Sequence, residues 1–213
     1  MTINKQNLTK IANSLKSHKY CELLIVTKKQ SVDDIMHLLQ MDYQIFGENR
    51  VQEAQSKYTN ILRKKFPKLK LHLIGPLQSN KTKLALNLFD VIQSIDRVKI
   101  VDEIIAELKK DINIKTKDFF IQVNIGEEKQ KSGIMPGDLN YLYNYCVQKK
   151  LNIVGLMCIP PIAADPEIYF SKMLVLKNEI NKNLLLSMGM SSDYEVALRY
   201  QSNTIRIGSK IFQ

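Results

Sequence analysis

The sequence predicts an α/β protein, a single-domain barrel over residues 1–213 in which eight parallel strands alternate with helices. Short apolar runs and amphipathic segments alternate regularly along the chain. The number of apolar runs is eight, which favours closure into a barrel. A length of 213 residues lies near the lower end of the range for this architecture and supplies enough residues for a buried core.

The first element is an amphipathic helix within residues 1–20, where Ile3, Leu8, Ile11 and Leu15 recur at helical spacing. The predicted strands are 22–27, 43–46, 70–74, 91–95, 119–125, 152–159, 184–188 and 204–207. The predicted helices between them are 31–40, 50–64, 79–88, 97–110, 135–150, 165–181 and 192–201. Because a helix separates each strand from the next, the strands are expected to be parallel.

The chain is basic, with 31 lysines and arginines against 21 acidic residues and a net charge of +10. Lysines dominate and are spread along the chain, which is typical of a solvated surface. A patch that attracts polyanions is the alternative. No nucleic-acid recognition motif accompanies the charge, so we expect no specific nucleic-acid partner.

The three cysteines, Cys21, Cys146 and Cys158, have no metal-ligand spacing, and an odd number argues against a complete disulfide framework. They are typical of reduced thiols in a cytoplasmic protein. The first 20 residues lack the continuous apolar core of a secretory signal, and no stretch is long enough to span a bilayer. We therefore expect a cytoplasmic protein without a membrane partner.

Five glycines, Gly47, Gly75, Gly126, Gly189 and Gly208, fall at the carboxyl ends of predicted strands. At such positions the backbone turns tightly or lets a ligand approach closely. Each could be a simple turn glycine. Together they indicate a rim of residues around a ligand-binding site, at the face where barrels of this kind place their active sites.

The last two predicted strands both end in a glycine followed by hydroxyl residues, at Gly189 with Ser191 and at Gly208 with Ser209. Such turns expose backbone N–H groups to a phosphate, and these barrels commonly bind phosphate after strands seven and eight. Ser192 and Glu195 form a capping-box pattern that predicts a helix N-terminus beside this site.

Lys28 follows the first predicted strand, and strand alternation places it on the same face as Leu24 and Val26. It could project into the barrel mouth. Partial desolvation there would make its amine a better nucleophile toward an aldehyde. The alternative is a surface lysine at the start of a loop.

Seven segments together resemble the YggS family of pyridoxal 5′-phosphate (PLP) binding proteins over nearly the whole chain. They are LIVTK (24–28), FGENRVQE (46–53), HLIGPLQSNK (72–81), QVNI (122–125) with KSG (131–133), GLMCIPP (155–161), LSMGMSSD (186–193) and TIRIGS (204–209). Each segment is weakly specific by itself. Their order and spacing make the resemblance highly specific.

The resemblance implies a barrel like the N-terminal domain of alanine racemase, a fold-type III PLP protein, with PLP bound as an internal aldimine to Lys28. Ser191, Gly208 and Ser209 match the phosphate-loop positions, and Ser187 and Gly189 would shape the approach to them. Lys29 is the less favoured candidate for the aldimine because strand parity points it the other way.

Two further residues are candidates for contacts to the cofactor. Arg206 shares a strand face with Gly208 and should point inward, toward either the ring nitrogen or the phosphate, with a structural surface arginine as the alternative. Asn49 would hydrogen-bond near the ring or cap the following helix. His72 lies at a strand start and is interpreted as part of the core or the bottom face.

The function implied is PLP homeostasis, in which a monomer holds the vitamin B6 aldehyde reversibly and delivers it to apo-forms of PLP-dependent enzymes. A weak amino-acid racemase or related PLP enzyme is the alternative. Racemases of this fold take an opposing base from an additional domain, which this chain is too short to contain. A third interpretation is an RNA-binding barrel. The absence of a nucleic-acid recognition motif argues against it.

The end of the chain departs from the family pattern. Family members usually continue with a glycine and a short segment after the position of Gln213. We expect a thinner outer wall and a more mobile phosphate site as a result.

Overall fold

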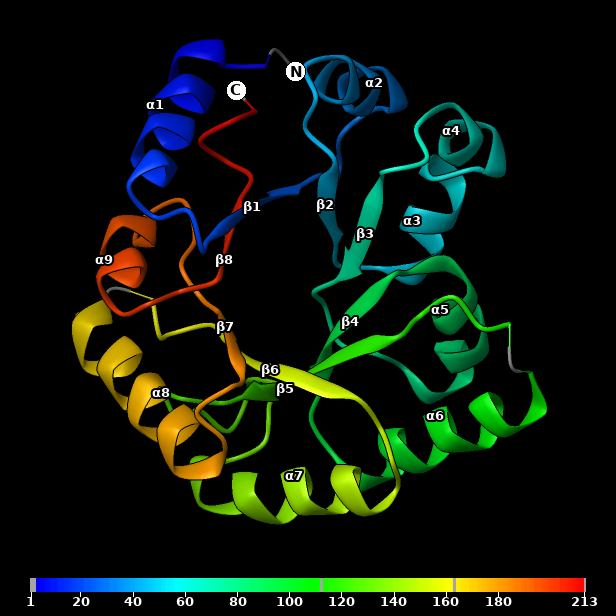
Figure 1. The fold of residues 1–213 in the computed structure, drawn as a ribbon, viewed down its shortest axis with the longest axis vertical. Coiled ribbons are helices and arrows are strands. Elements are labelled where there is room, and N and C mark those ends of the chain that lie inside the picture. The colour runs from blue at the N-terminus through cyan, green and yellow to red at the C-terminus, as the bar shows by residue number, and fades with distance from the viewer. Residues whose placement is uncertain (1–2, 112, 163, 213) are drawn as a thin grey trace.

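The protein folds as a closed barrel of eight parallel strands, described by a computed structural model for residues 3–111, 113–162 and 164–212. The strands pair in chain order, and β8 pairs with β1 to close the ring. Figure 1 shows the strands as an inner ring surrounded by the helices. The predicted α/β barrel is confirmed.

The strands begin and end within a few residues of their predicted bounds. They are β1 (Glu22–Val26), β2 (Ile45–Glu48), β3 (Lys70–Leu73), β4 (Val91–Ile95), β5 (Asp118–Val123), β6 (Ile153–Cys158), β7 (Leu185–Ser187) and β8 (Thr204–Ile207). The helices are α1 (Lys5–Lys16), α2 (Val32–Gln40), α3 (Val51–Lys57), α4 (Asn60–Lys65), α5 (Thr82–Leu88), α6 (Val98–Lys110), α7 (Leu139–Gln148), α8 (Pro166–Ile180) and α9 (Tyr194–Arg199), with short 3₁₀ helices η1 (Ser79–Lys81) and η2 (Pro136–Asp138).

The segment predicted as one helix over 50–64 is two helices, α3 and α4. Tyr58 ends α3 because its ring is buried and its hydroxyl lies 2.7 Å from that of Thr27. Thr59 then caps α4, with its side chain accepting from the backbone N–H of Leu62. A tertiary hydrogen bond therefore interrupts a helical pattern that is continuous in sequence.

Gly47 lies inside β2 and not at a strand end, so this rim assignment is wrong. A Cβ at Gly47 would lie 2.3 Å from Cδ2 of Leu24 in the barrel interior. A side chain there would displace that of Leu24, so packing between neighbouring strands favours glycine. The other four glycines follow the strands that they were predicted to end.

The barrel interior is apolar near Leu24, Val26 and Ile74, and a chain of polar side chains crosses it. The Gln93 amide donates to His72 Nδ1 at 2.9 Å and accepts from the Ser187 hydroxyl at 2.6 Å. All three side chains are buried. Because an amide nitrogen can only donate, His72 is neutral in this arrangement.

His72 makes the stability of the barrel sensitive to acid. Burial lowers its pKa from 6.5 to about 4. Between these values the unfolded chain binds the proton and the folded protein does not, so the free energy of unfolding falls as the pH falls through this window. From pH 7 to pH 5 this contribution is about 2 kcal/mol.

Urea unfolding at the two pH values measures this effect. His72→Gln, which keeps a neutral hydrogen-bonding side chain, should lose about 2 kcal/mol of the pH dependence that the wild type shows. His37 lies exposed on α2, and His37→Gln should keep the wild-type dependence. An equal pH dependence in wild type and His72→Gln would contradict the assignment.

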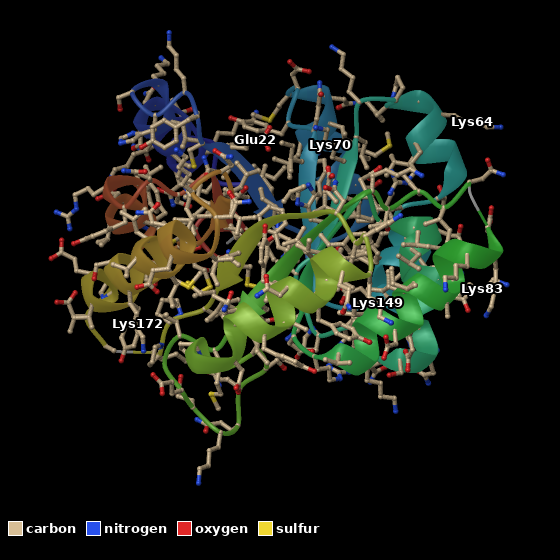
Figure 2. The ribbon with its side chains drawn as sticks, turned by 60° about the horizontal axis from the view of Figure 1, so that its bottom comes forward. Glu22, Lys64, Lys70, Lys83, Lys149 and Lys172 are labelled. Atoms are coloured by element: carbon tan, nitrogen blue, oxygen red, sulfur yellow. The ribbon has the colours of Figure 1, made fainter. Side chains whose placement is uncertain are left out.

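The basic side chains are distributed around the outside of the barrel. Figure 2 shows the labelled lysines Lys64, Lys83, Lys149 and Lys172 on different sides of the molecule, borne by or flanking α4, α5, α7 and α8. This distribution is typical of a solvated lysine-rich surface. Across the described residues, none of the helices has the length and apolarity needed to cross a membrane.

The two ends of the described chain lie side by side (Figure 1). Ile3 and Phe212 form an antiparallel bridge, and the Asn4 N–H donates to the carbonyl of Ile211 at 2.8 Å. Ile211 and Phe212 are both buried. The segment after β8 therefore packs against the start of α1 and forms part of the outer layer of the barrel.

Candidate functional site

A cavity of about 450 Å³ opens at the carboxyl ends of the strands. All six residues predicted to bind a cofactor line it. They are Lys28, Asn49, Ser191, Arg206, Gly208 and Ser209. A second hollow of about 540 Å³ shares Lys28, Asn49, Gly208 and Ser209 with the first and extends toward Phe212. Volumes of this size are typical of small-molecule sites.

The turns after β7 and β8 form one wall of this cavity. The Arg206 N–H donates to the Gly189 carbonyl at 2.9 Å, and the Lys210 N–H donates to the Ser191 hydroxyl at 3.4 Å. Gly189 has φ +93°, and a Cβ there would lie 2.5 Å from that of Ala197. The two turns thus lie together, and glycine is required at position 189 by the positive φ and by the close packing of α9.

The predicted capping box of Ser192 and Glu195 is wrong. α9 begins at Tyr194 with Asp193 as its N-cap residue and no side-chain cap. The Asp193 carboxylate accepts from the backbone N–H of Met190, and Glu195 accepts from the Tyr194 hydroxyl. The intervening residues form a turn, so Ser191 and Ser192 precede the helix and line the cavity directly.

Arg206 lies at the base of the cavity with 3% of its surface exposed. Its guanidinium donates to the Ser187 hydroxyl at 2.8 Å and to the Cys158 carbonyl at 2.7 Å. No carboxylate of the described residues forms an ion pair with it. Burial lowers its pKa, but a guanidinium stays protonated at neutral pH. The cavity floor therefore carries a positive charge that favours an anionic ligand.

Ser187 is fully buried and holds Arg206. Its hydroxyl accepts from Arg206 and donates to Gln93, which in turn donates to His72. No sequence pattern singles out Gln93 for this role. Strand parity placed Arg206 inward, but only the barrel register brings residues of β3, β4, β7 and β8 into one chain.

Lys28 lies at the cavity mouth, on the inward face that strand parity predicted. Its side chain lines both hollows and remains exposed, so the expected partial desolvation is not found. The reason is that β1 ends at Val26, two residues before Lys28. The amine is thus reachable by a ligand that enters the cavity from solvent.

Asn49 lines the cavity and does not cap a helix. α3 begins after Arg50, which is the N-cap residue and makes no side-chain cap hydrogen bond. Asn49 is partly buried between β2 and α3. Of the two roles that the sequence left open, its position is compatible with a contact to a ligand.

Comparison with curated proteins finds relatives over the full length of the chain, although no family model matches. The "Pyridoxal phosphate homeostasis protein" of Pasteurella multocida is 36% identical over 233 aligned residues, covering 100% of this chain and 97% of the relative. The protein of the same name from Aquifex aeolicus is 36% identical over 200 residues, covering 90% of this chain and 86% of the relative.

Solved structures show the same architecture. PipY of Synechococcus elongatus with PLP bound has a TM-score of 0.79 at 28% identity, covering 95% of this chain and 100% of PipY. Its structure without PLP has a TM-score of 0.84. Alanine racemase of Acinetobacter baumannii shares the fold, with a TM-score of 0.74 at 15% identity over 98% of this chain and 61% of the racemase.

Proposed function

This chain belongs to the pyridoxal phosphate homeostasis protein family, and from that premise we propose that it is a single-domain, monomeric, cytoplasmic carrier of PLP. PLP binding in this family is supported by the PLP-bound structure of PipY. In our proposal Lys28 binds PLP covalently as a Schiff base, and the loaded protein delivers PLP to apo-enzymes. The observation that carries the proposal is that one cavity brings together an accessible amine, a buried cation and two glycine-hydroxyl turns.

The residues of the cavity fit the chemistry of PLP. The aldehyde requires a primary amine, and Lys28 is accessible at the mouth. The phosphate requires N–H and hydroxyl donors, which the turns at Ser191 and at Gly208 and Ser209 provide. The apolar ring requires an apolar surface, and Ile74 and Ile159 line the same cavity.

Arg206 has a distinct role in this proposal. Two of its N–H donors hold it on Ser187 and on the Cys158 carbonyl, so the guanidinium is fixed before the ligand arrives. We propose that it donates to the ring nitrogen of PLP. A permanently charged donor there disfavours protonation of the ring and makes the cofactor a poor electron sink. Such a site suits storage of PLP better than catalysis with it.

Borohydride reduction of the PLP-loaded protein, followed by peptide mass analysis, tests this function. Reduction converts a Schiff base to a stable secondary amine on the lysine that formed it. We expect the modified peptide to be the one that contains Lys28. Exclusive modification of another lysine, or no modification, would overturn the proposed binding mode.

Transfer to an apo-enzyme is a separate measurement. Protein loaded with PLP should restore activity to a PLP-dependent apo-enzyme when the two are mixed after removal of free PLP. Failure of this transfer with Lys28 correctly labelled would exclude delivery while leaving the binding mode intact.

A further inference from the structure

A buried polar cluster lies outside the barrel wall, behind the residue proposed to bind PLP. The Lys57 cluster consists of Thr27, Glu48, Glu53, Lys57 and Tyr58. It occupies the space between the ends of β1 and β2 and helix α3. None of the proposed contacts to PLP uses it.

Lys57 is the centre of this cluster. Its ammonium donates to the Thr27 carbonyl at 2.8 Å, to Glu48 Oε1 at 3.1 Å and to Glu53 Oε1 at 2.6 Å. An ammonium has three donors, so these bonds use its full capacity. Only 8% of the residue is exposed, which is unusual for a lysine and requires such pairing.

Two hydrogen bonds of the Lys57 cluster hold the backbone on either side of Lys28. The Thr27 carbonyl, on its N-terminal side, accepts from Lys57. The Lys29 N–H, on its C-terminal side, donates to Glu53 Oε1, the same oxygen that accepts from Lys57. Lys57 therefore acts on one side directly and on the other through Glu53.

The backbone held in this way is in an unfavourable conformation. Lys29 has φ +62°, in the left-handed region that residues other than glycine rarely adopt. Such conformations persist where surrounding contacts impose them, and they concentrate at functional sites. The hydrogen bond from Lys29 to Glu53 is a contact of this kind.

Glu48 links the cluster to Tyr58. It is fully buried, and its Oε1 accepts from the Thr27 hydroxyl at 2.8 Å. Since Thr27 donates its single proton to Glu48, Tyr58 donates to Thr27. Burial raises the pKa of Glu48, whereas Thr27 and Lys57 lower it. Lys57 is the cation that compensates this carboxylate.

We propose that Lys57 is a positioning residue, which fixes the peptide units flanking Lys28 so that its amine faces the bound aldehyde. The inference rests on the proposed function, since it concerns the same amine. Loss of Lys57 would release the Thr27 carbonyl, weaken the hold of Glu53 on Lys29 and leave Glu48 without a cation. The Lys28 amine would then sample more orientations, which lowers the fraction of protein molecules in which it is positioned to bind PLP.

Two variants test this, because removing one partner of a buried ion pair can prevent folding. Lys57→Met keeps the length of the side chain and removes its charge. Glu53→Ala removes the acceptor of the Lys29 N–H, and the Glu53 side chain is 26% exposed, so this variant retains the core. Lys115→Met is the matched control. It breaks the ion pair to Asp90 at the amino-terminal end of β4, away from the cavity.

Amide hydrogen exchange of the protein without PLP gives the first readout. Exchange at the Lys29 amide should accelerate by roughly tenfold or more in Glu53→Ala, as expected for loss of a charge-assisted hydrogen bond, and by a smaller factor in Lys57→Met, where Glu53 is no longer held by the ammonium. The PLP dissociation constant should rise by roughly tenfold, and Lys115→Met should match the wild type in both measurements. The proposal is overturned by folded Glu53→Ala or Lys57→Met with wild-type exchange at Lys29, or by equal losses in Lys115→Met.

The two proposals fail in distinguishable ways. Borohydride labelling away from Lys28 in the wild type would remove the proposed binding mode, whereas the exchange experiment would still report whether Lys57 holds the turn. Labelling at Lys28 with unchanged exchange and affinity in the variants would remove only the positioning role.

Discussion

Replacing Lys28 with alanine is expected to abolish the visible absorption band that PLP forms with this protein, while the barrel remains folded. The band requires a Schiff base, and Lys28 is the amine at the mouth of the cavity. Its side chain is exposed and, among the described residues, no buried contact depends on it, so the free energy of unfolding should change by no more than about 0.5 kcal/mol. Absorption spectra and urea unfolding of the two proteins measure both effects.

The adjacent lysine supplies the control for this experiment. Lys29 is also exposed, but it lines only the hollow that extends toward Phe212 and not the cavity that contains Ser191 and Arg206. Lys29→Ala should therefore keep the absorption band. If the band persists in Lys28→Ala and disappears in Lys29→Ala, the cofactor lysine has been assigned to the wrong residue.

Replacing Arg206 with methionine is expected to weaken PLP binding strongly without comparable loss of stability. The guanidinium is buried among neutral hydrogen-bond acceptors, and no carboxylate of the described chain forms an ion pair with it. A buried hydrogen bond to a charged group contributes about 1.5–3 kcal/mol, which corresponds to a loss of affinity of roughly tenfold to a hundredfold.

The stability of the apo-protein should respond differently. Methionine removes the cost of burying the charge but leaves the Ser187 hydroxyl and the Cys158 carbonyl with one hydrogen bond fewer. These effects oppose each other, so we expect a net change within about 1 kcal/mol. PLP titration and urea unfolding of the apo-protein measure the two quantities. Unchanged PLP affinity in Arg206→Met would exclude the proposed contact.

Arg206→Lys separates charge from geometry. Lysine keeps the positive charge but cannot reproduce the planar donors that reach Ser187, Cys158 and a ligand together. An affinity between those of wild type and Arg206→Met would show that both charge and direction contribute. Wild-type affinity in Arg206→Lys would show that charge alone is sufficient.

Much of the cavity could be predicted because its residues follow local rules. Strand alternation placed Lys28 and Arg206 inward, and the glycine-hydroxyl turns placed Ser191 and Ser209 at the ends of neighbouring strands. Two errors arose at boundaries, where local patterns compete. Ser192 and Glu195 matched a capping box, but Asp193 provides the N-cap, and the continuous pattern over 50–64 concealed the break at Tyr58.

Local sequence patterns were sufficient to predict the order of the elements, the closure implied by eight strands and the inward face of Arg206. Hydrophobic periodicity is a local property, so it can be read without knowing which segments meet. The partners of the buried charges, in contrast, are known only from the folded structure. Arg206 donates a hydrogen bond to the carbonyl of Cys158, 48 residues earlier in the chain. Lys57 donates one to the carbonyl of Thr27, 30 residues earlier. Such contacts depend on strand register and on how a helix docks, which no local pattern encodes.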